Sequence, residues 1–132
     1  MTLIESVIAI LLVSIGLLGL LSMQPTSWNA SARADQLGHA AIILSRELTA
    51  RELSIMNPCN AVAAGTVTRT VYASAEDAAL SGDTSYGVQT TTAPLGGNGW
   101  RVTVRVTWPL NATGIAESIV VTRQEPFRMG CI

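Results

Sequence analysis

Residues 1–24 read MTLIESVIAILLVSIGLLGLLSMQ, and Glu5 is the single charged side chain among them. Every residue between Val7 and Met23 is apolar or small, and the next charge is Arg33. With its flanks, this run reaches the roughly 20 residues that a helix needs to cross a bilayer. An acid beside such a segment is costly and calls for a partner. The stretch therefore predicts a membrane-spanning helix with one ionisable group, Glu5, near its start.

The flanks of this segment separate three interpretations. A cleavable signal peptide begins with positive charge and ends at a small-residue cleavage site, and an ordinary anchor carries Lys or Arg on its cytoplasmic side. The sequence has neither pattern, since its first basic residue is Arg33. In the third interpretation, Met1 is the first residue left after removal of a short basic leader. The α-amino group of Met1 is then a cation that Glu5 can pair with, in its own chain or in a neighbouring subunit.

The same stretch resembles the mature N-terminus of type IV pilins and pseudopilins, where an aromatic residue or Met precedes T-L-[IL]-E and an apolar helix. Residues 14–20, with the sequence SIGLLGL, are most similar to the V-type minor pilins. The resemblance covers about 24 of the 132 residues. It implies leader removal by a prepilin peptidase, N-methylation of Met1, and a pilin-like fold.

A helical pattern continues beyond the apolar run. One apolar stripe recurs at i, i+4, i+7 and i+11 and consists of Leu37, Ala41, Leu44 and Leu48. Glu47 and Arg51 form an i,i+4 pair on another face. Pro58 restricts Asn57 to extended conformations, which predicts a helix over about residues 2–55.

Three residues weaken this helix locally. Gly16 and Gly19 each cost about 1 kcal/mol relative to Ala, and Pro25 costs about 3 kcal/mol. We expect either an irregular helix at Gly16, Gly19 and Pro25 or close packing of the small residues against another helix. The resemblance favours irregularity once the subunit is inside a fibre.

After Cys59 the hydrophobic pattern changes to period two, which is typical of strands. The clearest strand is Trp100–Trp108, with Ile115–Arg123 as its hairpin partner and weaker strands at Thr66–Ala73 and Ser85–Thr92. We predict an α+β fold: a long N-terminal helix packed on a small antiparallel sheet of three or four strands. The predicted divisions are 1–25 (transmembrane and assembly), 26–56 (amphipathic helix) and 57–132 (sheet head).

Cys59 and Cys131 are the two cysteines of the chain, an even count that permits one disulfide. The bridge would close a loop of roughly 70 residues and contribute about 4 kcal/mol in the chain-entropy model. It would hold the last segment near the end of the helix. The alternative is two unrelated thiols.

The sequence offers no catalytic constellation. It contains one histidine, and its two cysteines have neither redox nor zinc-site spacing, so we predict no enzymatic activity, no metal and no cofactor. Arg101, Arg105 and Arg123 could share the solvent face of the hairpin as a modest basic strip. The net charge of −1 favours a merely solvated face over a nucleic-acid site.

The leading hypothesis is a minor pilin-like structural subunit of a type IV pilus or pseudopilus. Its partners would be other pilin subunits, the bacterial inner membrane before assembly and the prepilin peptidase during maturation. The head would lie in the periplasm and later in a periplasmic or extracellular filament. Two alternatives remain open: a membrane-tethered periplasmic binding module that never polymerises, and a DNA-binding tip subunit of a competence pseudopilus.

Overall fold

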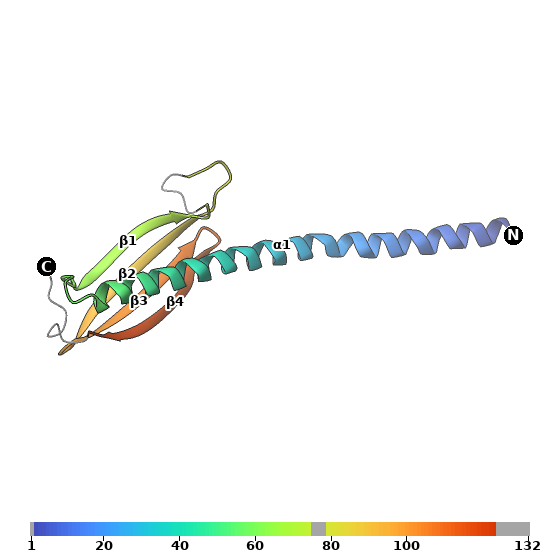
Figure 1. Cartoon of the computed structure of the whole chain (residues 1–132). Helices are drawn as coiled ribbons and strands as arrows, with labels where there is room; N and C mark the ends of the chain where they lie inside the picture. The colour runs from blue at the N-terminus through green and yellow to red at the C-terminus, as the bar shows by residue number, and fades with distance from the viewer. Residues whose placement is uncertain (1, 75–78, 124–132) are drawn as a thin grey trace. The chain divides into compact units, whose positions relative to one another are not determined.

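The fold is an α+β arrangement of one long helix and one antiparallel sheet (Figure 1). The computed structural model describes residues 2–74 and 79–123. Its elements are the helix α1 (Leu3–Met56) and the strands β1 (Gly65–Tyr72), β2 (Ser85–Gly96), β3 (Gly99–Trp108) and β4 (Asn111–Thr122). The strands lie in the order β1-β2-β3-β4, and each neighbouring pair is antiparallel. The predicted helix and antiparallel sheet are confirmed.

The chain divides into two compact units, Met1–Leu37 and Gly38–Ile132. In the first unit, α1 contains an 18-residue window with a mean hydropathy of 2.5, none of which is buried by the chain. This helix is long and apolar enough to cross a membrane. The boundary between the two compact units falls at Leu37, within the predicted amphipathic part of the helix. The buried residues of α1 accordingly begin at Ala40.

The described helix is continuous through the three residues predicted to disturb it. Pro25 lies inside α1, which remains α-helical on both sides of it. A Cβ atom added at Gly16 or Gly19 would meet nothing within 4 Å, so no close packing inside this chain requires a glycine there. In the single chain the helix is regular at these residues, because three weak residues do not outweigh the hydrogen bonding of the turns around them. Irregularity inside a fibre, and packing of the small residues against another subunit's helix, stay predictions.

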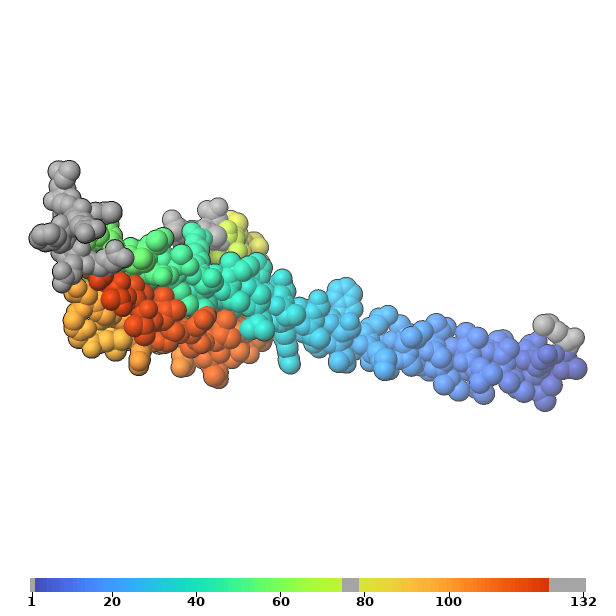
Figure 2. Space-filling view, turned by 60° about the horizontal axis from the view of Figure 1, so that its bottom comes forward, coloured from blue at the N-terminus to red at the C-terminus, as the bar shows by residue number. Residues whose placement is uncertain are grey.

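The core of the second unit lies between α1 and one face of the sheet. Its fully or nearly buried apolar side chains are Ala40, Leu44, Leu48, Ile55, Tyr86, Val88, Val102, Val104, Val106, Trp108 and Val121. From Val102 to Trp108, every second residue of β3 is buried, as a strand with one covered face requires. In the space-filling view, the C-terminal part of α1 (cyan to green) lies along β4 (red-orange) (Figure 2). Burying each large apolar side chain contributes about 1.5–3 kcal/mol.

The buried stripe of α1 differs in part from the predicted one. Ala40 is fully buried, whereas Ala41 and Leu37 are exposed. Leu44 and Leu48 are buried as predicted. Adjacent alanines fit a helical stripe equally well, and only the position of the sheet decides which one it covers.

The hairpin turns are shorter than predicted. Gly97 and Asn98 form the turn between β2 and β3, and Pro109 and Leu110 form the turn between β3 and β4. β4 consequently begins at Asn111, four residues before the predicted start.

Candidate functional site

The first candidate surface is the N-terminal part of α1 around Glu5. Glu5 lies in the first turn of α1, and its backbone N–H donates to the carbonyl oxygen of Thr2 at 3.0 Å. An acid in the first turn is favoured by the partial positive charge of the helix N-terminus. Among the described residues, no side chain forms an ion pair with the Glu5 carboxylate. Met1 lies outside the described residues, so the predicted pairing with an N-terminal amine stays a prediction.

The helix after Glu5 is apolar on all sides. Its large exposed side chains up to residue 23 are Val7, Ile8, Ile10, Leu11, Leu12, Val13, Ile15, Leu17, Leu18, Leu20, Leu21 and Met23. A helix that is apolar all round is found in lipid or between other helices rather than in water. This surface therefore needs a cover that the first unit does not itself provide.

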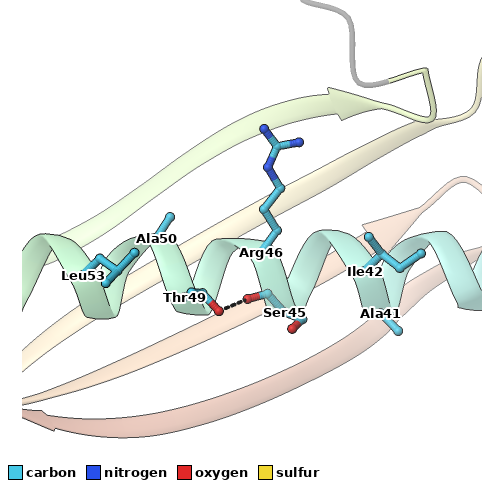
Figure 3. A pocket seen from close by; sticks show the side chains of 7 residues that line it. All are labelled: Ala41, Ile42, Ser45, Arg46, Thr49, Ala50 and Leu53. Atoms are coloured by element: carbon cyan, nitrogen blue, oxygen red, sulfur yellow. Dashed lines mark hydrogen bonds between the residues drawn. The ribbon is translucent and has the colours of Figure 1, made fainter.

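A second apolar surface lies on the outward side of α1 in the second unit. Figure 3 shows the residues around a shallow depression of about 660 Å³: Ala41, Ile42, Ser45, Arg46, Thr49, Ala50 and Leu53. Ile42 and Leu53 at its two ends remain 67% and 64% exposed. The Thr49 hydroxyl donates to the Ser45 carbonyl oxygen at 2.9 Å, so this polar group is satisfied within the helix. What remains for contact is mostly small and apolar, with Arg46 at one side.

Glu47 does not form the predicted pair with Arg51. Its side chain is buried, with 8% exposure, and forms an ion pair with Arg69 on β1. A buried carboxylate needs such a partner, because an uncompensated charge in the interior costs several kcal/mol. The pair links α1 to the edge strand β1. Helical spacing alone pairs Glu47 with Arg51, and the approach of Arg69 on β1 provides a different partner.

The three predicted strip arginines do not share a surface. Arg101 and Arg105 are exposed on β3, on the sheet face opposite the core. Arg123 instead donates from Nε to the carbonyl oxygen of Ile55 at 2.9 Å and from Nη2 to that of Asn60 at 2.6 Å. Its guanidinium also lies 5.2 Å from the centre of the Trp100 ring. The prediction was wrong for Arg123, because β4 ends at Thr122 and the next residue turns toward the end of α1.

These contacts cap the C-terminus of α1. The last carbonyls of a helix lack partners within the helix. Here the carbonyl of Leu53 accepts from the Asn57 N–H at 3.1 Å, and that of Ser54 accepts from the Asn60 side-chain amide at 3.2 Å. Arg123 serves the next carbonyl, that of Ile55. A cation at this end also interacts favourably with the helix dipole.

We expect Arg123→Ala to lower the free energy of unfolding by about 2 kcal/mol, because it removes two charge-assisted hydrogen bonds to backbone carbonyls. Urea unfolding followed by tryptophan fluorescence measures the change, since Trp100 lies under the guanidinium. Arg101→Ala removes the same side chain from an exposed strand position, and its effect should stay within about 0.5 kcal/mol. Equal effects of the two substitutions would contradict the capping role.

Cys59 is disulfide-bonded in the structure. Cys131, the other cysteine of the sequence, lies outside the described residues, so the Cys59–Cys131 pairing stays a prediction. The backbone N–H of Cys59 donates to the Asn57 side-chain oxygen at 3.0 Å. This bond fixes the turn that follows α1.

Asp83 stabilises the loop before β2. The pKa of Asp83 lies below its ordinary value of 3.8, because its carboxylate accepts hydrogen bonds from the Ser74 hydroxyl at 2.6 Å and the Leu80 N–H at 3.1 Å. Within residues 2–74 and 79–123, no group of three or more His, Cys, Asp or Glu side chains could hold a metal ion.

No protein-family model, curated protein or solved structure matches the chain. The class of this protein is therefore described by its fold and its surfaces. The protein combines one membrane-capable N-terminal helix with a helix-backed, four-stranded antiparallel sheet. Its main candidate surfaces are apolar helix faces and a polar sheet face.

Proposed function

We propose that this chain is a structural subunit of a type IV pilus or related pseudopilus, similar to the V-type minor pilins. The observation that carries the proposal is the N-terminal apolar helix, which the chain leaves wholly uncovered and which bears one acid in its first turn. The motif around Glu5 resembles that of pilins. The α+β layout of helix and antiparallel sheet agrees with the fold that this resemblance implies.

The uncovered helix would serve such a subunit both before and during its assembly into a fibre. Before assembly, it holds the protein in the bacterial inner membrane, with the sheet unit in the periplasm. During assembly, it moves from lipid into a bundle of neighbouring helices. Transfer between two apolar surroundings gains little hydrophobic free energy, so packing and polar pairing must direct it.

Glu5 provides that direction. In a bundle of apolar helices, its carboxylate pairs with the N-terminal amine of a neighbouring subunit. A subunit out of register would leave both charges unpaired in apolar surroundings, which costs several kcal/mol. The pair thus selects one axial position, by penalising the others.

The outward depression on α1 supports the same proposal. Its mostly small and apolar lining, between Ala41 and Leu53, offers a further contact area for neighbouring subunits. The function needs no catalytic group and no cofactor, and we assign the chain no enzymatic activity.

Mass spectrometry of the native protein tests the proposal. Fibres are sheared from the cells, and the N-terminal peptide is analysed from both the fibre and the inner-membrane fractions. We expect the protein in both fractions, with a methylated α-amino group on Met1. A protein confined to the membrane fraction, with unmodified residues preceding Met1, would show a tethered module instead.

A further inference from the structure

A row of hydroxyl groups crosses the outer face of the sheet. The strand register aligns Thr66 with Thr91, Thr91 with Thr103, and Thr103 with Ser118. The Thr66 and Thr91 hydroxyl oxygens lie 3.0 Å apart, and the Thr103 hydroxyl donates to that of Ser118 at 3.2 Å. Neighbouring strands are about 4.8 Å apart, so the row extends over roughly 14 Å. We call these four residues the hydroxyl row.

Two arginines flank the hydroxyl row on β3. Arg101 and Arg105 lie two residues before and two residues after Thr103, and therefore point to the same face. Each lies about 7 Å along the strand from the row. Both side chains are exposed, and in the described part of the chain neither forms an ion pair.

The described acidic residues of the sheet unit do not neutralise this face. Glu117 pairs in register with the buried Val104 and so belongs to the inner side of β4. Glu47 and Glu52 lie on α1, which covers the opposite face of the sheet, and Glu47 pairs there with Arg69. Asp83 is held by hydrogen bonds in the loop before β2. The outer face thus combines hydroxyl groups with unpaired positive charge.

We propose that the hydroxyl row, together with Arg101 and Arg105, binds an acidic polysaccharide. A guanidinium group matches a carboxylate with two parallel hydrogen bonds. Serine and threonine hydroxyls both donate and accept, as the hydroxyls of a sugar do. A glycan chain that bears carboxylates meets both requirements along its length. This inference does not depend on assembly into a fibre.

The aromatic side chains argue for a glycan over a nucleic acid. Proteins that bind single strands stack bases on exposed aromatic rings. Trp100 and Trp108 alternate with Arg101 and Arg105 along β3 and face the core side of the sheet, where Trp108 is buried and Trp100 lies under Arg123. Tyr72 is on the outer face, but it is six residues along β1 from Thr66, which places it about 20 Å from the hydroxyl row. Two arginines in a chain of net charge −1 also attract the phosphate backbone of a nucleic acid only weakly.

The test uses the full chain in detergent micelles and titrates it with polygalacturonate, with dextran as the neutral control polymer. We expect binding to polygalacturonate that weakens as salt is added, and none to dextran. R101Q and R105Q should each weaken binding by about fivefold, whereas R33Q, which removes the same charge from the first unit, should change it by less than about twofold. T103V removes the central hydroxyl without changing charge and should weaken binding by about threefold.

Three results would overturn the assignment. The proposed site does not exist if the protein fails to bind polygalacturonate. The same conclusion follows if R101Q, R105Q and T103V all leave the binding unchanged. Equal losses for R33Q and R105Q indicate attraction by net charge alone. Binding of a single-stranded DNA oligonucleotide as tight as that of polygalacturonate indicates a nucleic-acid surface. Because these measurements use separate subunits in micelles, they are independent of whether the chain enters fibres.

Discussion

Replacing Glu5 by alanine should deplete the subunit from sheared fibres by about a hundredfold or more, while leaving its amount in the membrane unchanged. The variant keeps every apolar residue of α1, so insertion into the bilayer is preserved. In the proposed fibre, however, a neighbouring N-terminal amine would lose its partner. An uncompensated charge in apolar surroundings costs about 3–5 kcal/mol, which corresponds to a hundredfold change or more. Quantitative immunoblotting of membrane and fibre fractions measures the ratio.

Glu52→Ala is the matched control, since Glu52 is an exposed glutamate of the same helix in the second unit. It removes one negative charge without touching the apolar segment, and its fibre fraction should equal that of the wild type. Glu5→Gln keeps the shape of the side chain and should behave like Glu5→Ala, because the pairing requires charge. Recovery of Glu5→Ala in fibres at the wild-type level would falsify the pairing.

Gly114→Ala should produce the largest loss of stability among glycine substitutions in the sheet unit. Gly114 has a φ of 65°, and a Cβ atom there would lie 2.0 Å from the carbonyl oxygen of Val106 and 2.8 Å from its carbonyl carbon. Both are backbone atoms of the neighbouring strand β3, which cannot rotate away as a side chain can. We expect the free energy of unfolding to fall by about 3 kcal/mol or more, from the clash and the left-handed backbone together.

Gly97→Ala separates the two contributions. Gly97 has a similar φ of 58°, but a Cβ atom there would meet nothing within 4 Å. Gly97→Ala should lower the free energy of unfolding by only about 1 kcal/mol, the cost of placing an alanine in the left-handed backbone conformation. Thermal unfolding of the full chain in detergent, followed by near-UV circular dichroism of the tryptophans, compares the variants. Similar melting temperatures for both would contradict the close approach of β4 to β3 at Gly114.

Local patterns predicted most of the secondary structure. The uncharged run from Val7 to Met23 is decisive for a helix, because few other structures satisfy its backbone in apolar surroundings. The alternation from Trp100 to Trp108 is equally clear for a strand with one buried face. Turn lengths were less accurate, since a two-residue turn such as Gly97-Asn98 depends on the register of both strands.

The candidate sites were predicted less completely. Glu5 could be singled out because the free-energy cost of placing its carboxylate beside an apolar segment depends only on the neighbouring residues in the sequence. The role of Arg123 could not, because its partners Ile55 and Asn60 are more than 60 residues away in the sequence. The hydroxyl row was also missed, although the alternating threonines of β1 and β3 were a visible signal. Their alignment into one row depends on the pairing of all four strands.

By itself, the sequence determined that the protein has an N-terminal apolar helix with one acid and a β-rich C-terminal part, because composition and periodicity are local properties of the chain. Only the tertiary structure decided which side of α1 is covered, as Ala40 is buried and Ala41 is not. It also paired Glu47 with Arg69 and left Arg101 and Arg105 beside the hydroxyl row. Each of these results depends on which distant segments meet, and burial and charge pairing are set by such long-range contacts rather than by the spacing of residues along the chain.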